Sequence, residues 1–374
     1  MISMKTYWRS YFTSPWVMAV TFVLPLLISL VIWWIFSSNV VRELPIDVVD
    51  LDQSHLSRMM IRDYDATPTL SVKSIQPDKE KANLALTKGD NYGYIIIPHD
   101  FEKNVMLGKS PKITGFYNGQ FILIAKQINS ALMQTDMTAQ AKLSVIKQLS
   151  IKETTWTQAI NAAVPIKVQV TPLFNLGSNY NQFLVSAILP AIWQMAVIVG
   201  MLWAMQNESV RTGCNSLREW FDKQDRLSIF NFTLVYFCIA MMLGAVLFYF
   251  LYGVIGFPFN GSITAFILNM SLMSFACISL GIAIGYGTND IVKAMSISGA
   301  YTAPSFAFLG VTFPVTDMNS LATFWHSILP ASHFVRAQIE LSNYGDSLVS
   351  AFPNIGVLTL FTLPLLLLSL KLKK

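Results

Sequence analysis

The sequence predicts an α-helical polytopic membrane protein with six transmembrane helices and an α/β extracytoplasmic domain inserted after the first helix. Two observations predict this class. Only 13% of the 374 residues are Asp, Glu, Lys or Arg, and 53% are apolar, whereas soluble domains carry about 25% charged residues. The charged residues also leave long uncharged gaps. Because a charge at the bilayer centre costs about 3 kcal/mol on insertion scales, such gaps outline membrane spans.

Uncharged gaps of suitable length occur throughout the chain. One gap extends from Arg226 to Asp290, and Gly and Pro at 253–261 divide it into two helices. About 20 apolar residues cross the hydrocarbon as a helix. The predicted spans are residues 17–36, 182–205, 229–252, 263–286, 295–313 and 352–370.

Lys and Arg are concentrated beside alternate ends of these spans, which predicts the orientation. Lys5 and Arg9 precede the first span, a basic loop at 206–227 follows the second, and lysines end the chain. Short cytoplasmic loops are the basic ones, so both termini are expected in the cytoplasm and residues 37–180 outside. This asymmetry accounts for the net charge of +5 without a nucleic-acid partner.

Residues 1–36 are expected to hold an interfacial helix and the first span. Met4, Trp8, Tyr11 and Phe12 repeat at helical spacing beside Lys5 and Arg9, a pattern typical of a helix in the membrane interface. An ordinary anchor would show the same pattern. A cleaved signal peptide is the other alternative, but the run is long and aromatic and lacks a small-x-small cleavage site. A retained span is therefore favoured.

Residues 37–180 alternate between strand-like and helix-like stretches, as expected for an α/β domain. Helices are predicted to begin at Ser54, Asp78 and Asp100, each a suitable N-cap, and a longer helix at 120–149. The predicted strands are 46–51, 69–72, 92–97, 112–117 and 166–170. A domain of this length can bury its own core.

Residues 181–374 are expected to form a five-helix transmembrane domain with a re-entrant outer hairpin at 314–346. Within this hairpin Pro330 separates two short apolar stretches, and neither is long enough to cross the membrane. His326 and His333 flank Pro330. Zinc needs three or four converging ligands, so these histidines are expected to be interfacial residues, and no metal site is predicted. The two stretches are 321–329 and 334–341.

Patterns that would indicate catalysis or cofactor binding are incomplete. Residues 108–110 (Gly-Lys-Ser) supply only the tail of a phosphate-binding loop, so a surface turn is expected. Asp50, Asp52 and Ser54 lack the glycine and closing glutamate of a calcium loop, so helix capping is expected. None of the three cysteines lies at 37–180, which implies no disulfide framework. No catalytic residue or cofactor is predicted on this chain.

The predicted spans contain no charged residue. Ion-coupled carriers generally keep an ionisable group in the membrane, so any active transport must draw its energy from another chain. Uncharged polar residues could line a translocation path or a subunit interface, or serve helix packing alone. These residues are Gln182, Gln194, Asn269, Ser271, Ser274 and Ser279.

The loop at 206–227 carries four basic and four acidic residues together with Leu217, Trp220 and Phe221. This pattern predicts a short amphipathic helix parallel to the membrane. The helix could dock into a cleft of a cytoplasmic partner, or it could be an anchored connector without a partner.

Several segments occur in an order that resembles the permease subunits of type 2 ABC transporters. The likeness covers essentially the whole chain and is greatest to the bacterial exporter branch with a large periplasmic domain between the first two spans. The segments are 46–54 (IDVVDLDQS), 56–58 (LSR), 93–98 (GYIIIP), 100–101 (DF), 208–213 (ESVRTG), 217–220 (LREW), Gly310, 313–314 (FP), 329–330 (LP) and 333–334 (HF).

The resemblance implies a half-transporter in the bacterial inner (plasma) membrane that exports a drug-like or amphipathic compound. A second permease subunit, in a homodimer or heterodimer, would complete the path. Separate ABC ATPase subunits would hold ATP and Mg, and a periplasmic adaptor and membrane lipid are further expected partners. Cys214 departs from the threonine-like residue of many relatives. The implied ATPase-coupling residues are Glu208, Arg211, Gly213, Leu217, Arg218, Trp220 and Phe221.

A rival hypothesis from another class is a membrane receptor or envelope scaffold that transports nothing and binds a ligand through its external domain. Such a protein needs no ATPase, so a neighbouring ATPase gene would discriminate between the two. A membrane enzyme is the weaker third hypothesis, because no catalytic grouping was found.

Overall fold

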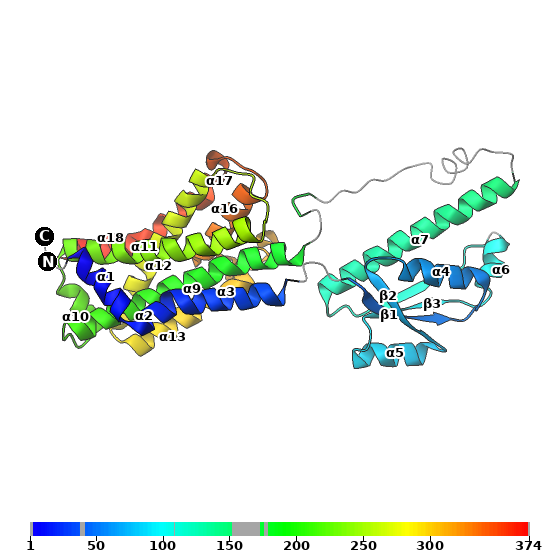
Figure 1. Ribbon diagram of the computed structural model, residues 1–374, viewed down its shortest axis with the longest axis horizontal. Coiled ribbons are helices and arrows are strands. Elements are labelled where there is room, and N and C mark those ends of the chain that lie inside the picture. The colour runs from blue at the N-terminus through cyan, green and yellow to red at the C-terminus, as the bar shows by residue number, and fades with distance from the viewer. Residues whose placement is uncertain (1–2, 38–41, 108, 152–172, 176–178, 373–374) are drawn as a thin grey trace. The chain divides into compact units, whose positions relative to one another are not determined.

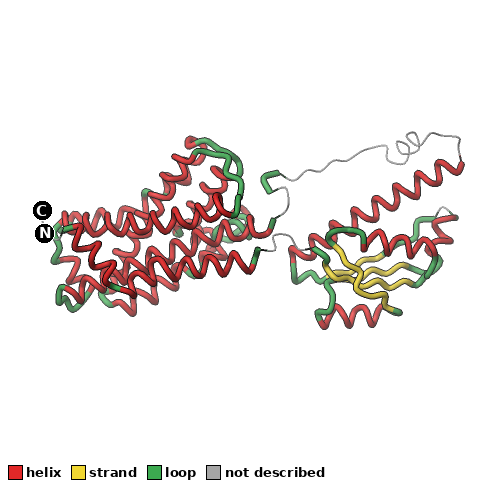
Figure 2. Tube along the Cα trace, viewed as in Figure 1, coloured by secondary structure: helices red, strands yellow, loops and turns green. Residues whose placement is uncertain are grey.

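The computed structural model describes residues 3–37, 42–107, 109–151, 173–175 and 179–372. The chain divides into two compact units. Unit 1 combines Met1–Asn39 with Pro172–Lys374 and is a helix bundle, and unit 2 is Val40–Thr171 and contains the sheet (Figure 2). Each unit has its own apolar core.

Unit 1 is entirely helical in the residues described (Figure 1). Its first part comprises α1 (Met4–Thr13), α2 (Pro15–Met18), the π-helix η1 (Ala19–Val23) and α3 (Leu24–Ile35). The second part comprises α9 (Tyr180–Arg211), α10 (Leu217–Asp222), α11 (Arg226–Tyr249), the π-helix η2 (Phe250–Val254), α12 (Ile263–Thr288), α13 (Ile291–Thr302), α14 (Ser305–Phe308), the 3-10 turn η3 (Val315–Asp317), α15 (Ser320–Ile328), α16 (Pro330–Ser342), α17 (Leu348–Val357), the 3-10 turn η4 (Leu360–Thr362) and α18 (Leu363–Leu370).

Five helical runs among the described residues are long and apolar enough to cross a membrane. They confirm five of the six predicted spans. The predicted span at 295–313 is not confirmed, because α13 has only twelve residues, or about 18 Å of helix at ~1.5 Å per residue. Pro304 follows its end, and Gly310 takes a φ of +81°. The five runs are Pro15–Ile35, Tyr180–Arg211, Arg226–Val254, Ile263–Thr288 and Ala351–Leu370.

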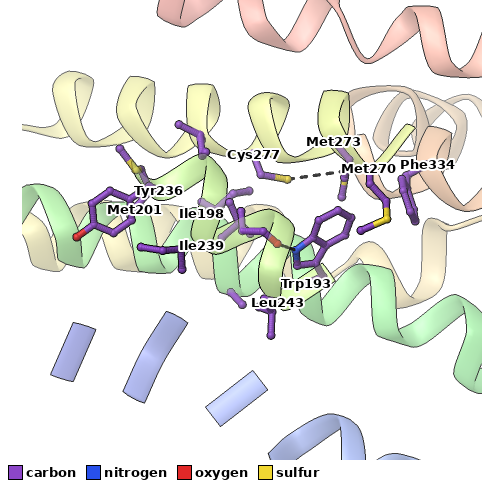
Figure 3. Packing of buried hydrophobic residues seen from close by; sticks show 14 of the residues in the cluster. Trp193, Ile198, Met201, Tyr236, Ile239, Leu243, Met270, Met273, Cys277 and Phe334 are labelled. Carbon is purple, nitrogen blue, oxygen red and sulfur yellow. Dashed lines mark hydrogen bonds between the residues drawn. The ribbon is translucent and has the colours of Figure 1, made fainter. Parts of the chain in front are cut away.

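Helix α9 packs closely against α11 and α12 in the centre of unit 1 (Figure 3). Trp193 of α9 is fully buried, and its indole Nε1 donates a hydrogen bond to the Ala240 carbonyl at 3.0 Å. Gly244 makes room for this ring, since a Cβ there would lie 2.6 Å from the indole. The ring of Phe334 from α16 meets Trp193 edge to face, with centroids 5.4 Å apart. The tryptophan therefore joins three elements of the bundle.

The first span contains a π turn, η1, where it meets α9. Thr21 of this turn faces Gly200, and a Cβ at Gly200 would lie 2.3 Å from Thr21 Cγ2. The hydroxyls of Tyr11 and Thr21 are 2.9 Å apart. A π turn contains more residues than an α turn. Here it brings Thr21 into a contact that only glycine on α9 permits.

Unit 2 is a four-stranded sheet in the order β2-β1-β3-β4, with helices on both faces. Strand β1 (Leu44–Asp50) pairs parallel with β2 (Leu70–Gln76) and β3 (Gly93–Ile97), and β4 (Thr114–Tyr117) pairs antiparallel with β3. Helices α4 (His55–Asp65), α6 (Phe101–Met106) and α7 (Ile122–Ile151) supply the core of one face. Helix α5 (Lys79–Lys88) covers the other face.

The predicted strands at 46–51, 69–72, 92–97 and 112–117 are confirmed within a few residues. The predicted strand at 166–170 lies outside the described residues. Ser54 and Asp78 cap α4 and α5, because their side chains accept from the backbone N–H of Ser57 and Lys81. Asp100 precedes α6, but its side chain makes no cap hydrogen bond. The predicted helix start at Asp100 is therefore confirmed, but this residue caps α6 without a side-chain hydrogen bond.

Candidate functional site

Helix α10 is the predicted amphipathic helix of the 206–227 loop, and its apolar side is turned into the bundle. Ser216 caps the helix by accepting a hydrogen bond from the Glu219 N–H at 3.1 Å. Leu217, Trp220 and Phe221 are each at most 1% exposed. Trp220 therefore cannot reach a partner directly in this structure, and its role is to fix α10 in place.

The aromatic residues of α10 contact two different spans. The ring of Trp220 lies 4.9 Å from that of Phe232 on α11, and the ring of Phe221 lies 5.5 Å from that of Tyr286 on α12. Burial of large aromatic side chains is among the strongest packing contributions to stability. Helix α10 is therefore seated firmly between the ends of two spans.

The opposite face of α10 is charged and open to solvent. Arg218 and Asp222 form an ion pair at 3.8 Å, and Lys223 Nζ lies 2.7 Å from Glu219 Oε1. The hydrogen bond from Lys223 lowers the pKa of Glu219, so this carboxylate stays ionised at neutral pH. An open hollow of about 380 Å³ lies over this face. It is lined by Ser216, Arg218, Glu219, Asp222, Lys223 and Asn289.

A second open hollow of about 500 Å³ lies at the turn between α12 and α13. Asn289 ends α12 with a φ of +61° and also lines the hollow over α10, so the two hollows adjoin the same turn. Val292 and Lys293 line the second hollow, and Val292 is 69% exposed. The surface beside α10 thus combines charge with apolar area.

The end of the chain lies at the same end of unit 1 as α10 (Figure 1). The guanidinium of Arg218 stands 4.9 Å from the centre of the Tyr286 ring, and the ammonium of Lys371 stands 5.9 Å from it. Arg226 donates to the carbonyls of Leu370 and Leu372. These contacts tie α10, α12 and α18 together.

A buried carboxylate, Glu208, joins α9 to α1. Its Oε2 accepts from Arg211 Nη2 at 2.5 Å and Nε at 3.1 Å, and its Oε1 accepts from Ser10 Oγ at 2.5 Å. Asn207 donates in turn to Ser10 Oγ at 3.0 Å. Glu208 is 1% exposed, so its charge depends on these partners. Sequence reasoning missed Ser10, whose only signal is a hydroxyl among apolar residues on one side of α1.

The connector between α9 and α10 is held by side chains and by one glycine. Ser209 Oγ is placed to donate to the carbonyls of Cys214 and Ser216, at 3.3 and 3.2 Å. Gly213 takes a φ of +66°, where side chains other than glycine are strained. The connector between α9 and α10 therefore has a defined shape.

A protein-family comparison decides the class. A model described as an ABC-2 family transporter protein matches residues 15–371. The chain belongs to the ABC-2 transporter family. It is a type 2 ABC transporter permease, a multi-pass membrane component of a family that associates with ABC ATPase subunits. No curated protein matches its sequence significantly.

Polar residues predicted to line a path or an interface of this ABC-2 permease mostly serve packing within the chain. Gln194 is fully buried, donates to Ser305 Oγ at 3.0 Å and accepts from the Ala331 N–H at 2.8 Å. Asn269 donates to the Phe334 carbonyl at 3.2 Å. Buried Ser274 and Ser279 bond to the Met270 carbonyl and the Leu365 N–H, whereas Gln182 and Ser271 are partly exposed.

The hairpin of this permease consists of α15 and α16, joined by Leu329. Pro330 begins α16, where its missing N–H costs nothing. His326 Nδ1 lies 2.7 Å from the Phe308 carbonyl, and His333 Nε2 lies 3.0 Å from the Ser327 carbonyl. The two imidazole rings are 5.8 Å apart. Among the described residues, no group of three metal-ligating side chains includes them.

In unit 2 of the permease, Asp50 and Asp52 cap backbone groups. Asp50 accepts from the N–H groups of Asp52 and Gln53. Asp52 accepts from the N–H groups of Phe101 and Glu102 at 2.9 and 3.0 Å and thereby caps α6. Burial raises the pKa of Asp52, but hydrogen bonds from Ser54 and these two amides outweigh it and lower the pKa below its usual value. The carboxylates are thus satisfied internally.

The tripeptide at 108–110, the incomplete phosphate-binding pattern, follows α6. Residue 108 lies outside the described residues. Lys109 donates its backbone N–H to the Asn104 carbonyl at 2.9 Å, and Lys109 and Ser110 are exposed. These two residues therefore lie at the surface beyond the end of a six-residue helix.

Proposed function

We propose that this permease is the membrane subunit of an ATP-driven exporter in a bacterial inner membrane, and that α10 is the docking element for separate ABC ATPase subunits. In this orientation both termini and α10 face the cytoplasm, and unit 2 faces the periplasm. The concentration of Lys and Arg at 206–227 and at the chain end supports this orientation.

The observation that carries the proposal is the two-sided structure of α10. One side is sealed against α11 and α12 by Trp220 and Phe221, and the other presents Arg218, Asp222 and their neighbours to solvent. A docking surface that moves as one body needs rigid packing behind its contact residues, which Trp220 and Phe221 provide. Charged rim residues set partner choice and association rate, which suits recognition of a separate protein.

In this proposal the ATPase subunits bind ATP and Mg, and their closure displaces α10. The displacement reaches α11 through Trp220, α12 through Phe221, and α9 through the connector that ends at Glu208. The spans then change between two packed arrangements, because nucleotide binding at a distant site biases a rigid-body equilibrium. No residue of this chain performs covalent chemistry.

A second permease subunit, identical or related, would complete the translocation path. We propose a drug-like or amphipathic compound as cargo, because the charged residues of the spans lie only at their ends and none lies mid-span to pair with an ion. Unit 2 would meet a periplasmic adaptor protein, and lipid would surround the exposed apolar faces of the spans.

The docking assignment is tested with the permease and the ATPase encoded beside it. Arg218→Asp is expected to weaken co-purification and lower ATP turnover about tenfold, equivalent to ~1.4 kcal/mol of binding. Lys142→Asp, on a similarly exposed lysine of unit 2, is the matched control and should leave both unchanged.

An exchanged pair separates partner recognition from helix stability. Arg218→Asp combined with Asp222→Arg restores the ion pair within α10 but inverts the charges that a partner meets. Docking should stay impaired in this double variant. Wild-type assembly and turnover in both Arg218→Asp and the exchanged pair would overturn the assignment.

A further inference from the structure

Helix α9 contains a proline, Pro190, at the eleventh position of its 32-residue span. Proline has no backbone N–H, so the carbonyl four residues earlier, that of Ser186, cannot receive its regular helical hydrogen bond. In hydrocarbon such a carbonyl needs another donor, because water is not available to it. Proline is also the commonest cause of a kink in a helix.

The missing donor comes from α16. Gln338 Nε2 lies 3.1 Å from the Ser186 carbonyl and 3.0 Å from the Tyr252 hydroxyl oxygen. Because a carbonyl only accepts hydrogen bonds, the amide nitrogen of Gln338 must face it. Gln338 is 1% exposed, so this bond lies inside the bundle. The re-entrant helix thus completes the backbone of the span at its weak point.

A second hydrogen bond joins the same two helices, and in this bond a side chain of α9 serves the backbone of α16. Ala331 lies in the first turn of α16, where backbone N–H groups have no partner within the helix. Gln194, one turn beyond Pro190, accepts from this N–H at 2.8 Å. Each helix therefore satisfies a backbone group that the other leaves open. This reciprocity links α9 and α16 more specifically than apolar packing would.

We propose that Pro190 is a hinge in α9 and that Gln338 is the positioning residue that holds this hinge in the conformation seen here. The far end of α9 carries Glu208 and Arg211, so bending at Pro190 would join events at α10 to the α15–α16 hairpin. This role in transport rests on the proposed function, whereas the pairing of Gln338 with the proline gap does not.

Tyr252 provides a second hydrogen-bond acceptor for the side-chain amide of Gln338. Its hydroxyl oxygen already lies within hydrogen-bond distance of Gln338 Nε2. When α9 bends and the Ser186 carbonyl withdraws, the amide keeps one acceptor and avoids becoming fully unpaired. The hinge can therefore open without the full penalty of a buried, unsatisfied donor.

The experiment is a double-mutant cycle on the full-length permease in detergent, read as the midpoint of thermal unfolding. Gln338→Met keeps the side-chain length and removes the donor, so it is expected to lower the midpoint by several degrees. In Pro190→Ala, position 190 has a backbone N–H again, and this group can donate to the Ser186 carbonyl. In that background, Gln338→Met should cost less than half as much, because the carbonyl no longer needs it.

Asn269→Leu is the matched control, because Asn269 is also a buried amide that bonds to α16 but does not touch α9's proline gap. Its effect should be the same with and without Pro190→Ala. If Gln338→Met does not fold, recovery of folded protein in the Pro190→Ala background is the expected result. Equal losses from Gln338→Met in both backgrounds would overturn the hinge assignment.

Transport is measured separately, with the ATPase bound. Pro190→Ala should lower ATP-coupled turnover at least tenfold without lowering the unfolding midpoint, because a continuous helix is stable but does not bend. Full turnover in Pro190→Ala would refute the hinge. Loss of ATPase docking in the α10 variants is a different result, so failure of the proposed function and failure of the hinge are distinguishable.

Discussion

Units 1 and 2 satisfy their buried polar groups with different chemistry. In unit 1, neutral amides such as Gln194, Asn269 and Gln338 bond to backbone groups of neighbouring helices. In unit 2, carboxylates accept the hydrogen bonds: Asp47 accepts from two side chains of β2, and Asp52 accepts from two backbone N–H groups of α6. The difference follows from the surroundings, because an ion is far more costly than an amide in hydrocarbon.

Glu208 is the exception in unit 1, because it is a buried carboxylate among neutral amides. Among the described residues, the buried carboxylates are Asp47 in unit 2 and Glu208 in unit 1, and Glu208 lies at the end of its span beside Arg211. A charge is thus used in the bundle only where a cation can reach it from the surface. The buried carboxylate of unit 1 therefore lies beside a cation at the end of a span, whereas neutral amides serve the interior.

Loss of apolar packing in unit 1 should have the largest effect on stability. Trp193→Ala is expected to lower the free energy of unfolding by about 3–5 kcal/mol, because a buried indole is replaced by a cavity. Trp34→Ala, at a side chain that is 70% exposed, serves as the control. Denaturation in detergent micelles measures both. A smaller loss at Trp193 than at Trp34 would contradict the central role of α9.

Loss of a buried carboxylate in unit 2 should have an intermediate effect. Asp47 is 1% exposed and accepts from Ser74 Oγ and Gln76 Nε2 of β2. Asp47→Ala removes the acceptor of both bonds, although Gln76 Nε2 still donates to Ser74 Oγ, and is expected to cost about 1–3 kcal/mol. Faster hydrogen exchange in β2 of the intact chain would report it, with exposed Asp90→Ala as the control. Unchanged exchange in β2 would show that the carboxylate is dispensable.

The smallest effect is expected at the cap of α6. Asp52→Asn should cost about 1 kcal/mol, a typical value for a lost cap. Because hydrogen bonds lower the pKa of Asp52, its contribution is present above the ordinary Asp pKa of about 3.9 and is lost as the pH falls through the lowered value. The protection of α6 amides from hydrogen exchange, relative to their intrinsic rates at the same pH, should therefore fall on acidification in the wild type. The same loss of protection in Asp52→Asn would exclude this cap as its cause.

Sequence reasoning found the spans and strands in which successive side chains share one property, such as the absence of charge. Uncharged gaps located five spans, and strand-like apolar stretches located β1 and β3. The predicted span at 295–313 is not confirmed, because a gap between charged residues does not register the break at Pro304. A continuous apolar stretch can be two short helices with a turn between them, and composition alone does not separate these cases.

Candidate-site residues were harder to predict because one side chain suits several surroundings. Trp220 could have faced lipid, a partner or the bundle, and it faces Phe232. Ser10 and Gln338 were not identified, because the role of a single hydroxyl or amide depends on the group to which it forms a hydrogen bond. For Gln338 a signal existed in the chain, since Pro190 within a span requires a donor from elsewhere.

The π turn at Ala19–Val23 determines how α1, which precedes it, is rotated about the axis of the first span. Each residue of an α-helix turns the chain by about 100°, so the extra residue rotates α1 by that angle relative to a regular first span. With α1 rotated in this way, the hydroxyl of Ser10 contacts the carboxylate of Glu208. The length of the first span, counted to a single residue, therefore decides which side of α1 the buried carboxylate encounters.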